Sequence, residues 1–183
     1  MKFLTITGVG PGDPSLLTLA AVDAIKESTV VSYPVSIREG ESLAEKIASK
    51  WISKDKKKLP LYFPMVDDLN MLKNAWRVAG NELMEMVEKG ERVVFLSQGD
   101  ISLFSTGSYL SQELEKHHPE CVVKLIPGVT SFAAAAAVPA AAVVPVKAAP
   151  APDKAGNIAG THMCLSLKIH RMGVLQHHIL RAY

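Results

Sequence analysis

Short β-rich apolar runs alternate with longer helical patterns over the first two thirds of the chain. The runs fall at residues 3–9, 29–33, 59–63, 92–96 and 121–126. A chain that alternates in this way makes right-handed crossovers and buries a mainly parallel sheet under helices on both faces. The pattern therefore predicts an α/β fold with a mainly parallel five-stranded sheet.

Apolar residues at helical spacing predict the helices that cover this sheet, at residues 16–25, 43–51, 69–89, 106–117 and 130–138. Ser15 is a plausible cap for the first of these helices. Pro34 follows the second apolar run and is expected to end that strand. Pro60 and Pro64 bound the third run, so we expect this strand at an edge of the sheet.

The composition changes after Ala133, where alanine, valine and proline dominate residues 133–152. The prolines interrupt any single regular element, so this tract is typical of a linker or loop. From Thr161 the chain has one strand-like run and one helical pattern, too little for an independent domain. We therefore expect an N-terminal α/β domain at 1–138, a linker at 139–160 and the start of an incomplete C-terminal α/β domain at 161–183.

Charge and composition exclude several classes of protein. The net charge of +2 and the 21% of charged residues indicate no broad surface for nucleic acid or for an anionic membrane. The apolar start is too short for a signal peptide, and the uncharged stretch 125–146 is mostly alanine with prolines, so no membrane span is expected. Cys121 and Cys164 favour a reducing cytosol, and the cytoplasm is the expected location.

Two other groups of polar side chains predict no functional site. His170, His177 and His178 have no acidic or cysteine partner at suitable spacing, so no metal is expected. The lysine-rich run 54–58 is typical of a solvated loop.

Three unusual loops follow predicted strands, at residues 8–13, 98–106 and 127–131. Ligands of parallel α/β sheets bind beyond the carboxyl ends of the strands, and glycine lets the backbone approach a ligand closely. Taken singly, each loop is also consistent with a tight turn or a helix entry. Ser105 or Thr106 could cap one helix, and Thr130 or Ser131 could cap the next or donate a hydroxyl to a ligand.

A dinucleotide site is the first alternative for the loop at 8–13. The fingerprint G-x-G-x-x-G requires a third glycine where Asp13 stands. The second strand also lacks the acidic residue that would bind a ribose, because it ends in Ser32, Tyr33 and Pro34. These two departures oppose an NAD-dependent oxidoreductase.

Together, in this order and spacing, the loops resemble the tetrapyrrole methylase family. That family carries G-x-G-P-G-D-P followed by L-L-T, then G-D-P-x-x-Y-S-T, then P-G-V-T-S-x-x-A-A-A. The corresponding segments here are 8–13 with 16–18, 99–106 and 127–135. Segments 33–35, 40–44 and 61–65, with Trp76, are similar to the subgroup that methylates C20 of precorrin-2 or cobalt-factor II. The resemblance covers about the first 138 residues.

The resemblance implies two α/β domains with S-adenosylmethionine in the cleft between them, a tetrapyrrole substrate and a homodimer. Asp100 is implied to pair with the ammonium group of the cofactor, and Arg38 is a candidate by position for the carboxylates of the substrate. No catalytic residue is identified. The residues implied to bind the cofactor are Pro11, Gln98, Gly99, Asp100, Leu103, Ser131 and Phe132.

The sequence departs from the family pattern in places. Ile101 replaces a proline and Phe104 replaces a tyrosine, whereas Leu167 stands where a cofactor-contacting methionine is expected. After Val138 the A-G-I-P-L turn and the G-D-E-x-L segment of the family are absent. The alternative to an active methyltransferase is therefore a catalytically inactive, truncated fragment of one.

Overall fold

The computed structural model describes residues 2–36 and 40–137. Residues Met1–Ser131 form one compact unit, and a second unit begins at Phe132. The expected domain boundary at 138, the linker and the C-terminal segment lie outside the described residues, and so do Arg38, Leu167 and the three C-terminal histidines.

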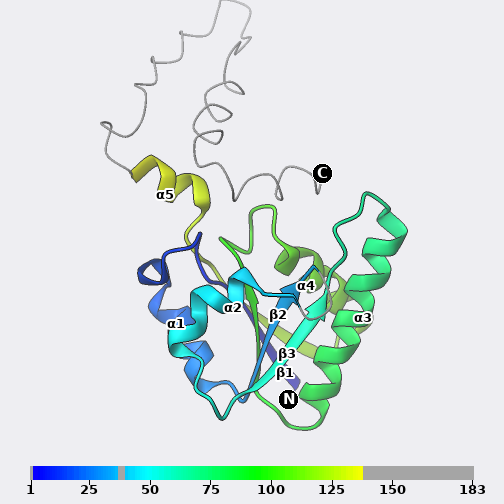
Figure 1. The fold of residues 1–183 in the computed structure, drawn as a ribbon. Coiled ribbons are helices and arrows are strands. Elements are labelled where there is room, and N and C mark those ends of the chain that lie inside the picture. The colour runs from blue at the N-terminus through cyan, green and yellow to red at the C-terminus, as the bar shows by residue number, and fades with distance from the viewer. Residues whose placement is uncertain (1, 37–39, 138–183) are drawn as a thin grey trace, which may run out of the picture. The chain divides into compact units, whose positions relative to one another are not determined.

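The first unit is built on a parallel sheet of five strands in the order β3-β2-β4-β1-β5 (Figure 1). The neighbouring strands β1 and β4 are buried along most of their length, which explains their largely apolar sequences. This arrangement confirms the predicted mainly parallel sheet and places β3 at an edge, as its prolines indicate. The strands are β1 (Lys2–Gly8), β2 (Val30–Val35), β3 (Lys57–Tyr62), β4 (Val93–Ser97) and β5 (Cys121–Ile126).

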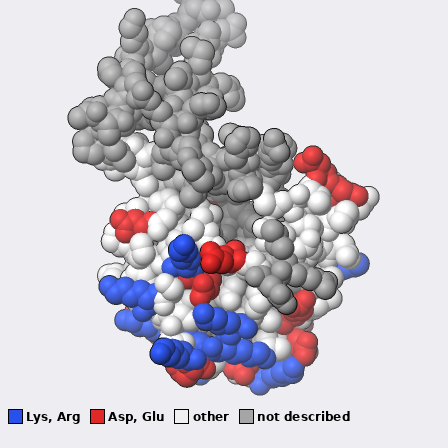
Figure 2. Space-filling view, in the orientation of Figure 1, with Lys and Arg blue, Asp and Glu red and all other residues white. Residues whose placement is uncertain are grey.

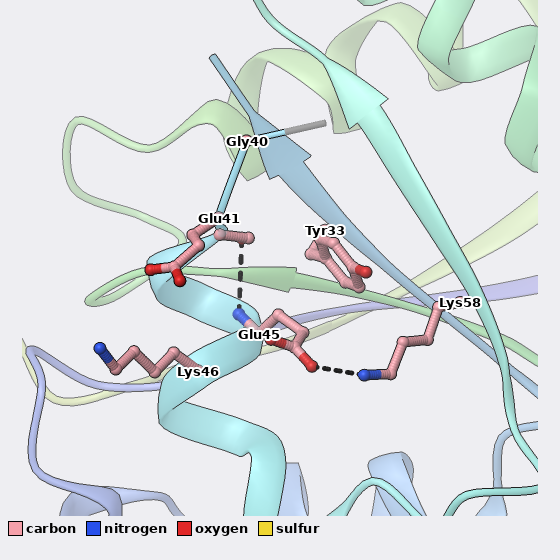
Figure 3. Close-up of a pocket in the computed structure, with 7 residues that line it drawn as sticks. Tyr33, Gly40, Glu41, Glu45, Lys46 and Lys58 are labelled. Atoms are coloured by element: carbon pink, nitrogen blue, oxygen red, sulfur yellow. Dashed lines mark hydrogen bonds and ion pairs between the residues drawn. The ribbon is translucent and has the colours of Figure 1, made fainter. Parts of the chain in front are cut away.

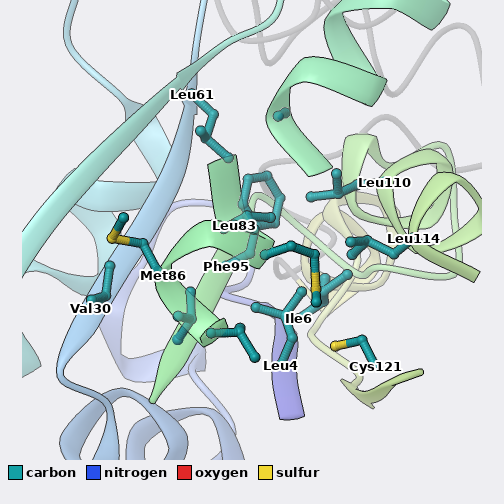
Figure 4. Close-up of a cluster of buried hydrophobic side chains, with 14 of the residues drawn as sticks. Leu4, Ile6, Val30, Leu61, Leu83, Met86, Phe95, Leu110, Leu114 and Cys121 are labelled. Atoms are coloured by element: carbon teal, nitrogen blue, oxygen red, sulfur yellow. The ribbon is translucent and has the colours of Figure 1, made fainter. Parts of the chain in front are cut away.

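Helices cover both faces of the sheet, and each face has its own apolar core. The larger core contains Phe95 between Leu83 and Leu110, under α3 and α4 (Figure 4). The smaller core contains Ile25 and Ile47, under α1 and α2. None of the helices that the structure describes has the length and apolar character needed to cross a membrane. The helices are α1 (Leu19–Glu27), α2 (Leu43–Ala48), α3 (Leu69–Glu88), α4 (Thr106–His117) and α5 (Ser131–Ala137).

The direction of the chain across the sheet reverses between β4 and β1. The chain runs outward from β1 through β2 to β3, returns to β4 beside β1, and then crosses to β5 on the other side of β1. The helices of the outward path lie on one face, and those of the return path lie on the other. Such a reversal opens a crevice at the carboxyl ends of the two neighbouring strands, where ligands of these folds bind.

Two local predictions are wrong. Thr18, not Ser15, caps α1, because its hydroxyl accepts a hydrogen bond from the Ala21 N–H at 3.2 Å. Ser15 instead lies in a short 3₁₀ turn, where its N–H donates to Asp13 at 2.8 Å. Pro34 does not end β2, because the pairing of β2 with β4 stops at Ser32 and the missing N–H of the proline faces no ladder there.

Candidate functional site

The loops after β1 and β4 are joined backbone to backbone. The Gly10 N–H donates to the Gly99 carbonyl at 3.1 Å, and the Gly99 N–H donates to the Gly10 carbonyl at 2.9 Å. The Val9 N–H adds a bond to the Ser97 carbonyl at 2.8 Å. Both glycines have positive φ angles, 80° and 70°, which an L side chain rarely adopts. Glycine is therefore required here for the two loops to pair.

The loop after β5 packs against the same two loops without space for a side chain. A Cβ added at Gly128 would lie 2.2 Å from the Gly99 carbonyl oxygen and 2.9 Å from the Gly8 carbonyl carbon. A Cβ at Gly8 would lie 2.5 Å from the Gly99 oxygen. The three loops predicted from the sequence are thus in direct contact, and we call residues 8–13, 98–106 and 127–131 the loop cluster.

Asp100 is the buried charge of the loop cluster, with 7% of its surface exposed. Its Oδ1 accepts hydrogen bonds from the N–H of Ser102 at 2.9 Å and from the Ser102 hydroxyl. Its Oδ2 accepts from the Gly128 N–H at 2.7 Å. Burial acts to raise the pKa of Asp100, but the hydrogen bonds from Ser102 and Gly128 outweigh it and hold the pKa below its usual range. The carboxylate is therefore ionised at neutral pH.

Two serines fix the end of the loop that leads from β4 to α4. The Ser97 and Ser105 hydroxyls are 2.6 Å apart in a buried hydrogen bond. Ser105 also caps α4, because its Oγ accepts from the Gly107 N–H at 3.0 Å. Between these anchors Phe104 has a φ of 47°, unusual for a bulky residue, and its side chain is 70% exposed. The capping role of Ser105 was one of the predicted alternatives, but its bond to Ser97 was not predicted.

One side of the loop cluster is open. Among residues 2–36 and 40–137, nothing lies within 4 Å of a Cβ added at Gly12 or Gly99, so these residues leave the backbone there open to another molecule. Pro11, Gln98 and Gly99 are half-buried, whereas Leu103 is 41% exposed.

The structure brings most of the predicted site residues together. Pro11, Gln98, Gly99 and Asp100 belong to two loops that pair directly, and Leu103 lies in the second of these loops. Ser131 ends the first compact unit, and Phe132 begins the second, with its side chain 51% exposed.

A pocket of about 320 Å³ that the sequence did not predict lies beside β2 and the start of α2 (Figure 3). Across it the Lys58 ammonium pairs with the Glu45 carboxylate at 2.7 Å. The Tyr33 ring lies between them and the Gly40 backbone, and burial raises the pKa of its hydroxyl. We call this the α2 pocket; its lining residues are Tyr33, Gly40, Glu41, Ser42, Glu45, Lys46 and Lys58.

The lysine-rich run 54–58 is not a loop throughout, so that prediction is wrong in part. Lys57 and Lys58 begin β3, and the Lys56 ammonium donates to the carbonyls of Lys26 and Ser28 at the end of α1. The predicted start of α2 at residue 43 agrees with the structure, and Ser42 and Glu45 have the spacing of a capping box there. No comparable signal joins Glu45 to Lys58.

On the face that Figure 2 shows, lysine and arginine side chains gather over the lower part of the described residues, with aspartates and glutamates beside them. In the α2 pocket the pairing of Lys58 with Glu45 likewise balances the charges. The loop cluster, with its open backbone and ionised carboxylate, is therefore the stronger candidate for a binding site.

The chain matches known proteins over the part that contains the loop cluster. It is 34% identical over 128 residues to the cobalt-precorrin-2 C(20)-methyltransferase of Salmonella typhimurium, covering 70% of this chain and 53% of that protein. It is 35% identical over 131 residues to the probable cobalt-precorrin-2 C(20)-methyltransferase of Methanocaldococcus jannaschii, covering 71% and 54%. The chain thus spans about half the length of these relatives.

A solved structure with the same fold is the native form of uroporphyrin III C-methyl transferase from Thermus thermophilus. It is 26% identical, with a TM-score of 0.54, and the match covers 75% of this chain and 52% of that one. The family model of the tetrapyrrole (corrin/porphyrin) methylases matches residues 4–147, which is most of the chain. The expected family is thereby confirmed, and this chain belongs to the tetrapyrrole (corrin/porphyrin) methylases.

Proposed function

We propose that the protein takes part in S-adenosylmethionine-dependent C-methylation of a tetrapyrrole, at C20 of precorrin-2 or cobalt-factor II, in cobalamin biosynthesis. The observation that carries this proposal is the loop cluster, in which three glycine loops meet at the reversal point of the sheet. The choice of C20 is supported by the two relatives with that activity in their names. The homodimer stays a prediction from the resemblance, and the cytoplasmic location stays a prediction from the cysteine content.

The residues of the loop cluster suit the cofactor. The backbone beside Gly12 and Gly99 is open and lacks side chains, so amino-acid and ribose groups can approach its N–H and carbonyl groups. Backbone groups of Gln98, Gly99 and Asp100 would hold the amino-acid part. Pro11 would line the site, and Leu103 offers an exposed apolar side chain for the nucleoside. Ser131 and Phe132, at the start of α5, are the remaining residues that the resemblance implies for the cofactor.

Bound S-adenosylmethionine supplies a methyl group that its sulfonium activates for attack by an electron-rich ring carbon. The task of the chain is to hold the cofactor so that carbon, methyl and sulfur lie in line, and to exclude water. Rigid loops meet this requirement, because small misplacements of reacting atoms slow a transfer strongly. Two backbone hydrogen bonds join Gly10 to Gly99, and the Asp100 carboxylate accepts a hydrogen bond from the Gly128 N–H. These contacts provide the rigidity.

The second candidate function is a catalytically inactive fragment. The observation that favours it is that the A-G-I-P-L turn and the G-D-E-x-L segment of the family are absent after Val138. Such a fragment would fold through its first unit, Met1–Ser131, and would transfer no methyl group by itself.

The test is a methyl-transfer assay with purified protein, labelled S-adenosylmethionine, and precorrin-2 or cobalt-factor II as acceptor. An active enzyme transfers label to one acceptor, and nuclear magnetic resonance of the product locates the methyl group at C20. Transfer to another carbon would contradict the proposed position. A folded chain that transfers no label to either acceptor would support the inactive fragment.

A further inference from the structure

Three groups of this chain donate hydrogen bonds to the buried carboxylate of Asp100. They are the N–H and the hydroxyl of Ser102 on Oδ1 and the N–H of Gly128 on Oδ2. A carboxylate has about four lone-pair sites in total. Most of its capacity is therefore used inside the protein, and only 7% of the residue is exposed.

The bond to Gly128 is the one that crosses between loops. It joins the loop after β4 to the loop after β5, 28 residues further along the chain. At this point the Gly128 backbone also packs against the Gly99 carbonyl so closely that no side chain would fit. The direction of the Gly128 N–H thus determines how the loop that leads to Ser131 sits on the loop that contains Gln98.

We propose that Asp100 is a positioning residue that holds Gly128, and with it the β5 loop, against Gly99, and that it does not pair with the ammonium group of the cofactor. This inference rests on the proposed function for its ligand, but the contact between Asp100 and Gly128 is a property of the protein alone. It replaces the direct role that the family resemblance implied for this side chain.

Replacing Asp100 by asparagine tests the positioning role, because asparagine cannot accept all the hydrogen bonds that the carboxylate accepts. An asparagine has one acceptor oxygen and one NH₂ group in place of two oxygens. If the asparagine oxygen faces Ser102, its NH₂ group faces the Gly128 N–H and cannot accept from it. If the side-chain amide is flipped, the NH₂ group faces the Ser102 N–H and cannot accept from that group. Asp100→Asn therefore loses one of these contacts in either orientation.

The first experiment compares two ligands by calorimetric titration of the wild type and of Asp100→Asn. S-adenosylhomocysteine carries the ammonium, and 5′-methylthioadenosine lacks the whole amino-acid part. A positioning role predicts that the variant loses affinity for both ligands by the same factor, about 10-fold to 100-fold. Weakened binding of S-adenosylhomocysteine with unchanged binding of 5′-methylthioadenosine would overturn it. Asp68→Asn, at the exposed cap of α3, is the matched control.

The second experiment uses the wild type alone, without a ligand and without any variant. The amide resonance of Gly128 in the wild type is followed by nuclear magnetic resonance during acid titration. The proposal predicts that this resonance shifts as Asp100 takes up a proton, below the ordinary aspartate value of 3.8. A Gly128 amide that does not respond would overturn the proposal. A responding amide in a protein that binds neither ligand would contradict the proposed function and leave the contact in place.

Discussion

The loop cluster and the α2 pocket lie beside strands of one sheet, but the first is built mainly from backbone and the second mainly from side chains. In the loop cluster, backbone packs on backbone, and Gly8 and Gly128 leave no space for a side chain between the loops. In the α2 pocket, long side chains form the walls, and the contact that crosses it joins Lys58 to Glu45. Backbone atoms cannot rotate aside as side chains can, so the arrangement of the loop cluster is more tightly determined than that of the α2 pocket.

The largest effect is expected for Gly128→Ala, which breaks the backbone packing of the loop cluster. The new Cβ would lie 2.2 Å from the Gly99 carbonyl oxygen, and a backbone atom cannot move aside as a flexible side chain can. We expect the free energy of unfolding, measured in urea, to fall by about 3 kcal/mol or more. Gly90→Ala is the control, with a φ of 82° and nothing within 4 Å of an added Cβ, and should lose about 1–2 kcal/mol. Equal losses would contradict tight packing at Gly128.

Acid should weaken the loop cluster specifically through Asp100. Its pKa in the folded protein is lowered, so the ionised carboxylate stabilises the fold above the unfolded pKa, and this stabilisation is lost as pH falls through the folded pKa. At neutral pH we expect Asp100→Asn to be about 1–3 kcal/mol less stable than the wild type.

The difference between the wild type and Asp100→Asn should shrink below the ordinary aspartate value of 3.8, where the carboxylate becomes protonated. Urea unfolding of both proteins from neutral to acid pH measures this difference. A stability difference that stays constant with pH would show that the charge of Asp100 does not stabilise the loops.

Two buried serine caps, one in each region, provide a matched comparison. Ser105 accepts from the Gly107 N–H at 3.0 Å and bonds to the Ser97 hydroxyl, whereas Ser42 accepts from the Glu45 N–H at 3.5 Å. Ser105→Ala should cost about 1–2 kcal/mol, and Ser42→Ala about 0.5 kcal/mol. Thermal or urea unfolding of the two variants checks the order, and a larger loss for Ser42→Ala would reverse the comparison.

The smallest effect is expected in the α2 pocket, for Lys58→Met. The Lys58 side chain is 52% exposed and that of Glu45 is 23% exposed, so solvent screens their ion pair and its loss should cost about 0.5 kcal/mol or less. The hydrogen bond to Glu45 raises the pKa of Lys58, so its contribution is present below the ordinary lysine value of 10.5 and disappears as pH rises through the folded pKa.

Urea unfolding of the wild type and of Lys58→Met at neutral and at alkaline pH measures this small difference. Glu45→Gln removes the other charge and should give a similar loss. A loss in either variant as large as that of Ser105→Ala would show that the α2 pocket is also rigidly specified.

The two regions also differ in how far the sequence predicts them. The loop cluster was predictable because each loop carries glycine and follows a strand, and parallel strands bring their carboxyl ends to one edge. The bond from Gly128 to Asp100 was not predictable, because it depends on how two loops 28 residues apart face each other. The contact of Lys58 with Glu45 was missed for a similar reason, since β3 begins inside a lysine run that is typical of a loop.

The most direct test of the account is calorimetric titration of the purified chain with S-adenosylhomocysteine, with Gly128→Ala measured beside it. We predict saturable micromolar binding by the wild type and a clear loss of affinity in Gly128→Ala, which breaks the loop packing. A folded wild-type chain that shows no binding would contradict the claim that the loop cluster of this polypeptide forms a cofactor site.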